Sequence, residues 1–192
     1  MMKPSQNLHA QLLLLQVGVT DAATNELQST GVAAGGPAGV PQTSEAAGLK
    51  ALESFLRRAG ISRDEVALEE GAGRSRHDLV TPAATVALLR YMDRHTAAGT
   101  FRDSLPVAGV DGTLKHRMKD TAAAGNARAK TGSLGHVSTL SGYVSSAAGE
   151  RFAFALMLNN YRSTDAHKPV HADLDDIVVL LARLPWRTEP SR

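Results

Sequence analysis

The sequence predicts an α+β fold in which an antiparallel sheet is flanked by helices. Apolar residues recur at helical spacing through the first half of the 192 residues. Three runs with strand character then follow one another, and a last stretch returns to helical spacing. Helices, an antiparallel meander and a closing helix are the element order of an α+β domain.

The first predicted helix covers residues 8–17, which are apolar nearly all round. Such a helix is usually buried, and Gly18 is expected to end it. Residues 19–43 are rich in Ala, Gly, Thr and Pro, so we expect this segment to be a flexible loop.

Two further helices are expected before the meander. Thr43 or Ser44 can cap a helix that runs to about Arg58 and has one leucine-rich face. Thr81 followed by Pro82 predicts the start of the next helix, because proline fits the first helical position.

The meander is expected to contain strands at residues 127–134, 137–146 and 151–159. An earlier short strand is expected at residues 66–68. The closing helix is expected at residues 169–184, where four apolar residues line one side at helical spacing.

Composition limits the classes of function. Apolar residues at 43% suffice for a packed core, and a net charge of +2 argues against nucleic acid as the main partner. The absence of cysteine excludes disulfides and thiolate metal sites, and we expect no cofactor. No apolar run approaches the ~20 residues that span a bilayer, and the chain start lacks the layout of a signal peptide.

Two short motifs contain the side chains that serine acyl-transfer chemistry requires. Ser5 and Asn7 form a Ser-x-Asn motif, and Lys130, Thr131 and Gly132 form a Lys-Thr-Gly motif. A serine hydroxyl is a poor nucleophile until a base takes its proton, and a lysine with a lowered pKa can be that base. We therefore expect the hydroxyl, the amide and the ammonium to converge in one pocket as catalytic groups.

Each motif also has a simpler interpretation. Ser5 or Asn7 would cap the helix that follows, and Lys130 would be a solvent-facing lysine before a turn. If residues 127–134 are a strand, Lys130 and Gly132 point to one face, and Gly132 leaves room for another backbone to come close. A substrate peptide would then pair along this edge, and the Ser133 N–H would donate to the oxyanion.

Several further segments resemble one family. Residues 70–76, followed by Val80-Thr81-Pro82, resemble the pattern Asp-Gly-Ser-Gly-Leu-Ser-Arg with a following Val-x-Pro. That pattern lies between the two motifs in the D-alanyl-D-alanine carboxypeptidase and endopeptidase family of low-molecular-weight penicillin-binding proteins, peptidase family S13. Further segments resemble the same family: residues 2–8, 104–109, 111–114, 129–134 and 141–143. In total, the resemblance covers most of residues 2–160.

The resemblance implies a penicillin-binding transpeptidase/β-lactamase-like fold and a serine-type enzyme that acts on peptidoglycan stem peptides outside the cytoplasm. It implies a proton relay at Ser5, a substrate-amide contact at Asn7, and binding of the terminal carboxylate by Lys130 and Thr131. Gly132 and Ser133 complete the expected substrate-binding set, and the full-length parent is expected to bind β-lactams. At two positions, Glu70 and Ala72 replace the family's usual Asp and Ser.

The family's nucleophile motif, Ser-x-x-Lys, is missing, because no lysine of this chain has a serine three positions before it. We therefore expect residues 1–186 to be the C-terminal part of the penicillin-binding domain, with a disordered tail at 187–192, and we expect the chain alone to be inactive. The alternatives are a non-catalytic module that binds peptidoglycan peptides and a β-lactamase-like hydrolase. The segment from Glu70 to Pro82 fits the peptidase better than the β-lactamase.

Histidines offer weaker candidates. His167 and His171, with Asp173 and Asp175 beyond them, have the spacing of a metal site on a helix. Pro169 lies between the two histidines, which favours an ordinary surface segment and no metal. His136 lies near the Lys-Thr-Gly motif and is interpreted as a polar loop residue.

Overall fold

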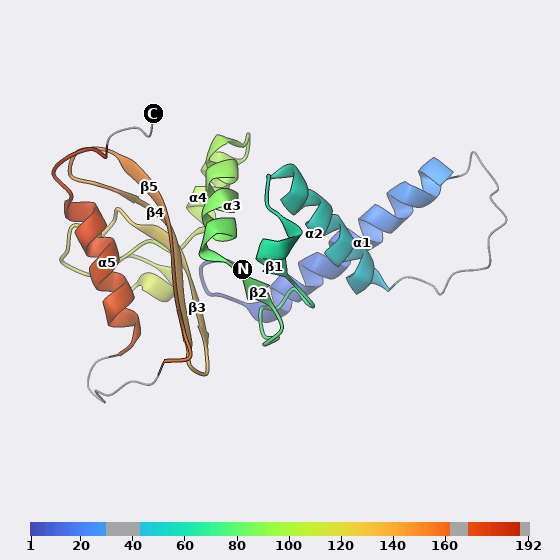
Figure 1. Ribbon diagram of the computed structural model, residues 1–192, viewed down its shortest axis with the longest axis horizontal. Coiled ribbons are helices and arrows are strands. Elements are labelled where there is room, and N and C mark those ends of the chain that lie inside the picture. Colours follow the sequence, from blue (N-terminus) through green and yellow to red (C-terminus); the bar gives the residue numbers. More distant parts are fainter. Residues whose placement is uncertain (30–42, 162–168, 189–192) are drawn as a thin grey trace. The chain divides into compact units, whose positions relative to one another are not determined.

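Helices and antiparallel strands make up the computed structural model, which confirms the predicted α+β fold class (Figure 1). The structure describes residues 1–29, 43–161 and 169–188. Most of the expected loop and the last four residues of the expected tail therefore lie outside the described residues. Within the described ranges, no helix is both long enough and apolar enough to cross a lipid bilayer.

The described residues form two compact units. Residues 1–5 and 85–192 form the first, which we call the sheet unit, and residues 6–84 form the second, which we call the helical unit. The start of the chain thus belongs to the same unit as the Lys-Thr-Gly motif, even though the next residues belong to the other unit.

The sheet unit contains the three predicted strands, within one residue of their expected bounds at each end. They are β3 (Arg128–Leu134), β4 (Val137–Ser145) and β5 (Arg151–Asn159), in the order β3-β4-β5 and antiparallel throughout. In the register, Lys130 lies opposite Ser141. Among the described strands, β3 and β5 each have a single neighbour, so both are edges.

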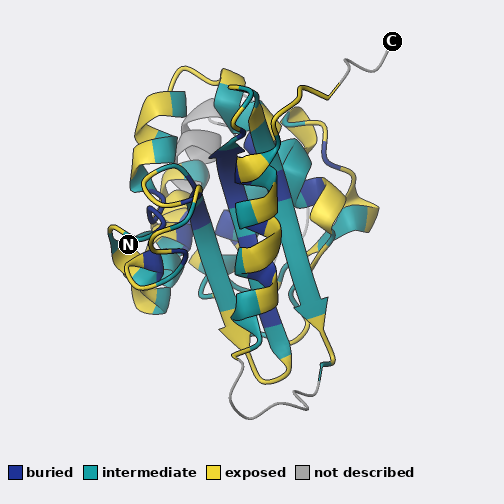
Figure 2. Cartoon of the chain, turned by 90° about the vertical axis from the view of Figure 1, so that its left-hand side faces the viewer, coloured by how far each residue is buried: buried dark blue, intermediate teal, exposed yellow. Residues whose placement is uncertain are grey.

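Helices cover both faces of this sheet (Figure 1). The closing helix, α5 (His171–Arg183), lies along one face with its exposed side chains outward (Figure 2). The other face is covered by α4 (Ala98–Ser104) and by the later part of α3 (Pro82–Arg94). No sequence pattern predicted α4, because this helix has seven residues and no side-chain cap.

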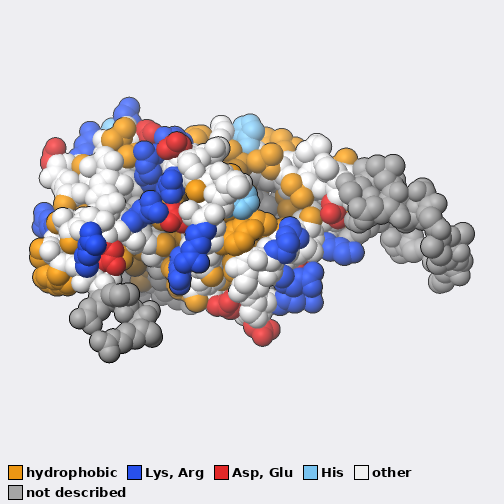
Figure 3. Space-filling model, turned by 90° about the horizontal axis from the view of Figure 1, so that it is seen from above, with side chains coloured by type: hydrophobic (Ala, Val, Ile, Leu, Met, Phe, Trp, Pro, Cys, Tyr) orange, Lys and Arg blue, Asp and Glu red, His pale blue; other side chains and the backbone are white. Residues whose placement is uncertain are grey.

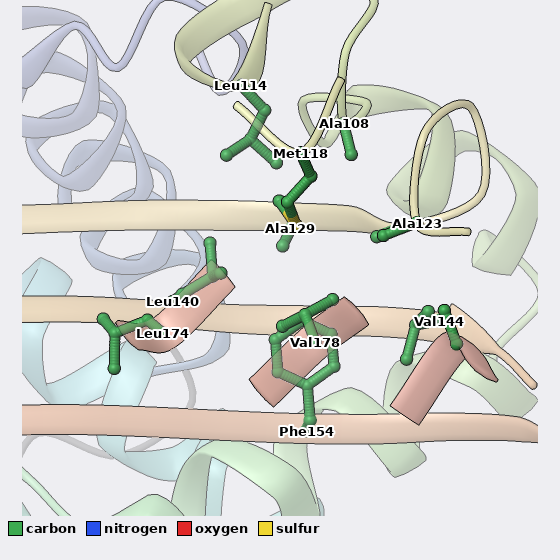
Figure 4. Close-up of a cluster of buried hydrophobic side chains, with 12 residues drawn as sticks. Ala108, Leu114, Met118, Ala123, Ala129, Leu140, Val144, Phe154, Leu174 and Val178 are labelled. Carbon is green, nitrogen blue, oxygen red and sulfur yellow. The ribbon is translucent and has the colours of Figure 1, made fainter. Parts of the chain in front are cut away.

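Five of the twelve buried residues in the core between α5, the sheet and the loop that precedes β3 are alanines (Figure 4). Ala108, Ala123 and Ala129 are fully buried beside Leu140 and Val178. Because alanine side chains are short, the loop can pack closely over β3. The short 3₁₀ helix η2 (Gly112–Leu114) is anchored in this core by Leu114, which is also fully buried.

A smaller cluster holds α3 against the opposite face of the sheet. The Tyr143 hydroxyl donates to the carbonyl oxygen of Leu89 at 2.6 Å, and burial raises the pKa of Tyr143 to about 12. The phenol therefore stays protonated and keeps donating at any ordinary pH. Met2 packs against the same cluster, which ties the start of the chain to the sheet unit.

The helical unit consists of α1 (Asn7–Ser29), α2 (Ser44–Arg58) and a two-stranded ladder of β1 (Val66–Ala67) and β2 (Leu79–Val80). The Thr43 hydroxyl accepts a hydrogen bond from the backbone N–H of Ala46, which confirms the predicted cap of α2. A 3₁₀ turn, η1 (Arg63–Glu65), leads into β1.

Gly18 does not end α1, contrary to the sequence prediction, and the helix continues to Ser29. No glycine or proline interrupts residues 19–29, so nothing in the backbone stops the helix there. Gly18 has a different role at the crossing of α1 and α2. A Cβ at Gly18 would lie 1.8 Å from the carbonyl oxygen of Ser44, and one at Gly48 would lie 2.3 Å from that of Leu14.

The helix expected at residues 8–17 is buried on one side only. Leu14 faces α2 and is buried, but Leu8 is 68% exposed, and Leu12, Leu13 and Val17 are about half exposed. The sequence is apolar all round, whereas the rest of the helical unit packs against only one side of this helix. An apolar face of α1 is therefore open to solvent in this structure.

The close approach of α1 and α2 makes the first testable prediction. Gly18→Ala places a methyl group inside a backbone contact, so it should lower the free energy of unfolding by about 1–3 kcal/mol. Urea unfolding followed by circular dichroism measures the change. Gly99→Ala is the matched control, because nothing lies within 4 Å of the added methyl in α4 and the helix should be unchanged or slightly more stable. Equal stability of the Gly18 variant and the wild type would contradict the described crossing.

Candidate active site

The Ser5 hydroxyl and the Lys130 ammonium meet in the sheet unit, although 125 residues separate them in the sequence. Lys130 Nζ donates to Ser5 Oγ at 2.6 Å and to the carbonyl oxygen of Thr131 at 2.6 Å. Both side chains are partly buried. The Ser5 hydroxyl is thus engaged with an ammonium group and not with a helix end, and Lys130 is not a freely solvated lysine.

The surroundings of Lys130 favour loss of its proton. Burial lowers the pKa of the Lys130 ammonium below its usual value. Within the described ranges, no Asp or Glu lies at ion-pair distance from this ammonium to restore the charge. A lysine that is desolvated, uncompensated and bonded to a hydroxyl can pass a proton through that hydroxyl.

Ser5 has a backbone conformation that is uncommon for a residue with a side chain. Its φ is +57°, in the left-handed region, and its N–H donates to the carbonyl oxygen of Met2 at 3.3 Å. The chain therefore turns sharply at Ser5, immediately before α1 begins at Asn7. Strain of this kind persists only where the surrounding structure holds it.

Asn7, the other expected residue of the first motif, is the first residue of α1. It belongs to the helical unit, whereas Ser5 belongs to the sheet unit. Its contact with a substrate amide stays a prediction.

The open edge of β3 can accept another extended chain. The N–H of Ala129 donates to the carbonyl oxygen of Pro106 at 2.9 Å, and not to β4. Alternate residues of a strand direct their backbone groups to the same side, so Thr131 and Ser133 present theirs at the edge away from β4. Ser133 itself is exposed. This geometry is compatible with the predicted strand addition and with the predicted oxyanion role of the Ser133 N–H.

Gly132 lies close to a side chain of the neighbouring strand. A Cβ at this position would lie 2.4 Å from Thr139 Oγ1 on β4. The predicted approach of a substrate backbone to Gly132 stays a prediction. The Thr131 hydroxyl, in turn, donates to Thr113 Oγ1 at 2.8 Å.

The turn around Glu70, where the family's Asp and Ser are replaced, is closed by the longer carboxylate. Glu70 accepts hydrogen bonds from the backbone N–H groups of Ala72, Arg74 and Ser75. Partial burial acts to raise the pKa of Glu70, but these three N–H groups outweigh it and hold the pKa below its usual value. The Gly71 N–H donates to Gln11 Oε1 at 2.7 Å, which fixes the turn to α1 within the helical unit.

Of the residues in the histidine candidates, His136 and Asp175 have other partners. His167 lies outside the described residues, and the Asp175 carboxylate is held by the Arg117 guanidinium at 2.6 Å. No group of three possible metal ligands occurs within the described ranges. His136 lies in the turn between β3 and β4, and its Nδ1 is 2.9 Å from the carbonyl oxygen of Tyr161.

Basic and acidic side chains are interspersed on the face that Figure 3 shows, without a continuous basic stripe. The small net charge of +2 fits this distribution.

Comparisons with known proteins agree with the motifs and the geometry. Residues 1–183 match the D-Ala-D-Ala carboxypeptidase 3 (S13) family, and the chain belongs to this family. It is 36% identical over 195 residues to a D-alanyl-D-alanine carboxypeptidase of Actinomadura sp. (strain R39), covering 99% of this chain and 32% of that protein. It is also 36% identical over 120 residues to the carboxypeptidase DacB of Haemophilus influenzae, covering 62% of this chain and 25% of that protein.

A solved structure supports the same fold. The structure resembles penicillin binding protein 4 (dacB) of Haemophilus influenzae with a TM-score of 0.73 and 30% identity, over 96% of this chain and 38% of that one. The fold is therefore that of the penicillin-binding carboxypeptidases, as the sequence predicted. The chain spans about a third of the length of these relatives.

Sequence reasoning missed the residues that support the site. Lys3 forms an ion pair with Asp111, and Thr113 contacts both the Lys3 backbone and the Thr131 hydroxyl. The segment Asp111-Gly112-Thr113 stands out in the sequence as part of the family resemblance. Its contact with the first residues of the chain could not be read from local pattern, because more than a hundred residues separate the partners.

The lowered pKa of Glu70 makes the second prediction. A carboxyl group with a lowered folded-state pKa stabilises the fold above its unfolded value and loses this contribution as the pH falls through the folded value. The free energy of unfolding of wild type should therefore fall between about pH 5 and pH 3. That of Glu70→Gln should be about 1–2 kcal/mol lower than wild type at pH 7 and should fall less over the same range. Urea unfolding at several pH values measures both. Glu53→Gln, which removes an exposed ion pair with Arg63, is the control. Parallel pH curves for wild type and Glu70→Gln would count against the carboxylate as the group that closes the turn.

Proposed function

We propose that these residues form the proton-relay and peptide-binding side of a serine-type active site. The reaction is D-Ala-D-Ala carboxypeptidase or endopeptidase hydrolysis of peptidoglycan stem peptides through an acyl-enzyme. The observation that carries the proposal is the hydrogen bond from Lys130 Nζ to Ser5 Oγ beside the open edge of β3, in a chain of the S13 family.

In the proposed reaction, the nucleophilic serine comes from outside these 192 residues. The lysine of the same Ser-x-x-Lys motif takes the serine hydroxyl proton as the serine oxygen bonds to the carbonyl carbon of the penultimate D-Ala, and the C–N bond to the last residue breaks. The departing amine takes a proton through the Ser5 hydroxyl, which Lys130 can replenish. Water then hydrolyses the ester. Desolvation keeps the Lys130 proton mobile, as the lowered pKa indicates.

The edge of β3 supplies the proposed binding surface. A substrate peptide pairs with the outward backbone groups of Thr131 and Ser133, and the Ser133 N–H stabilises the oxyanion. Lys130 and the Thr131 hydroxyl bind the terminal carboxylate, and Asn7 contacts a substrate amide. Gly132 leaves space beside Thr139 on β4.

The relatives suggest further properties of the parent protein. One structure of penicillin binding protein 4 from Haemophilus influenzae is a complex with a β-lactam, so we infer that the parent binds β-lactams. Carboxypeptidases of the cell wall act outside the cytoplasm, and we infer the same compartment for this protein. Residues 1–186 would then be one part of the penicillin-binding domain.

A second candidate is a module that binds peptidoglycan peptides without turnover. The observation that favours it is the absence of Ser-x-x-Lys from all 192 residues. Both candidates use the same β3 edge, so they differ only in whether a nucleophile joins it.

Labelling with a fluorescent penicillin makes the third prediction. The isolated chain should show no covalent band after denaturing electrophoresis, because it has no Ser-x-x-Lys to acylate. A penicillin-binding carboxypeptidase labelled in parallel is the positive control. A stable band that disappears on Ser5→Ala would show that a serine of this chain can act as the nucleophile, and it would overturn this part of the proposal.

Peptide binding makes the fourth prediction. A peptide ending in D-Ala-D-Ala should bind the chain in the millimolar range and shift the amide NMR signals of Thr131 and Ser133. Lys130→Ala should weaken binding by at least ten-fold, because it removes the ammonium that pairs with the carboxylate. Lys50→Ala, an exposed lysine on α2, is the matched control and should leave binding unchanged. Equal binding of an L-Ala-L-Ala peptide, or full binding by Lys130→Ala, would contradict the proposed site.

A further inference from the structure

We propose that Asp111, Gly112 and Thr113 form a clamp that positions Ser5 against Lys130, with Asp111 and Thr113 as positioning residues. The clamp itself follows from contacts within the sheet unit. Its importance for catalysis rests on the proposed function.

The first contact of the clamp is an ion pair. The Asp111 carboxylate binds the Lys3 ammonium, two residues before Ser5, and its other oxygen accepts the Val107 N–H at 2.9 Å. The Lys3 hydrogen bond lowers the pKa of Asp111, so the carboxylate stays charged at neutral pH. Both side chains are about one third exposed, so solvent partly screens the pair.

The second contact joins backbone to backbone. The Thr113 N–H donates to the carbonyl oxygen of Lys3 at 3.1 Å. Gly112 has a φ of +55°, and a Cβ there would lie 2.6 Å from the same carbonyl oxygen, so only glycine allows this approach. Because Leu114 is fully buried, the clamp is fixed to the core of the sheet unit.

A short turn connects Lys3 to Ser5, so the contacts of Lys3 also fix the position of Ser5. The Ser5 N–H returns to the Met2 carbonyl oxygen, and Met2 packs against the cluster around Tyr143. With Met2 and Lys3 both held, the left-handed backbone at Ser5 directs its hydroxyl toward Lys130 Nζ. The clamp thus explains how the unfavourable φ of Ser5 is maintained.

The third contact joins the clamp to β3. The hydroxyls of Thr113 and Thr131 are 2.8 Å apart, and each can donate or accept. When no anion is present, Thr131 can donate to Thr113. When a carboxylate takes the Thr131 hydrogen, Thr113 can donate to Thr131 instead, so Thr131 Oγ1 keeps a partner in both states. Valine in place of Thr113 would remove this reversible bond, and serine would keep it.

The ion-pair arm of the clamp is tested by a double-mutant cycle on the full 192-residue chain. The readout is the pH titration of the Lys130 side chain by NMR with labelled lysine. Asp111→Asn should release Ser5 and shift the Lys130 midpoint downward, because the buried ammonium then loses an acceptor that favours its charged form. Lys3→Met should give the same shift, and the double variant no more than either one. An unchanged Lys130 midpoint in a folded Asp111→Asn, or additive shifts, would overturn this arm.

The hydroxyl arm is tested by the side-chain torsion of Thr131, measured by NMR couplings. Thr131 should occupy one rotamer in wild type and in Thr113→Ser, and several in Thr113→Val, with about ten-fold weaker binding of the D-Ala-D-Ala peptide in Thr113→Val only. A single Thr131 rotamer in Thr113→Val would overturn this arm. If wild type binds no peptide, the proposed function fails, while the torsion and the Lys130 titration still decide on the clamp.

Discussion

The short hydrogen bond between the Lys130 ammonium and the Ser5 hydroxyl is the interaction on which the arrangement of the site depends. It joins the start of the chain to the edge of a sheet built from residues more than a hundred positions later. A charged group in a partly desolvated position is costly unless it is hydrogen-bonded. The bond therefore gives the ammonium an acceptor. The same desolvation lowers the pKa of Lys130, and the proposed proton relay needs a lysine with a lowered pKa.

Close packing of the preceding loop on β3 helps this bond to form, because several residues of the core there are small. Fully buried alanines lie where larger side chains would push the preceding loop away from the sheet. The loop can then bring Asp111, Gly112 and Thr113 to the edge, and these hold the residues before Ser5. Packing, a tight turn and one ion pair thus act together to place a single hydroxyl.

The sequence predicted the features that are encoded locally. The three strands of the meander, the cap at Thr43 and the start of α3 follow from alternation, capping chemistry and the position of Pro82. The Ser-x-Asn and Lys-Thr-Gly motifs named two side chains that the structure brings into contact. The family resemblance was confirmed by the match over residues 1–183.

Features that depend on tertiary neighbours could not be predicted in the same way. Gly18 has the signature of a helix end, but the structure uses its missing side chain at a helix crossing. The apolar residues of α1 predicted burial, although their sequence says nothing about how many partners are present. The pairing of Lys3 with Asp111 depends on a loop path that no local pattern records. The roles of Asn7, Thr131, Gly132 and Ser133 remain predictions.

The second bond of Lys130, to the carbonyl oxygen of Thr131, has a consequence for any chain that docks on β3. That carbonyl is one of the outward groups with which an incoming strand must pair, so the incoming N–H competes with the ammonium for the same oxygen. Once displaced, the ammonium has a hydrogen free for the guest's carboxylate while it keeps its hold on Ser5. Docking of a chain on the β3 edge would then replace one hydrogen-bond partner of Lys130 Nζ, the Thr131 carbonyl oxygen, by the carboxylate of that chain.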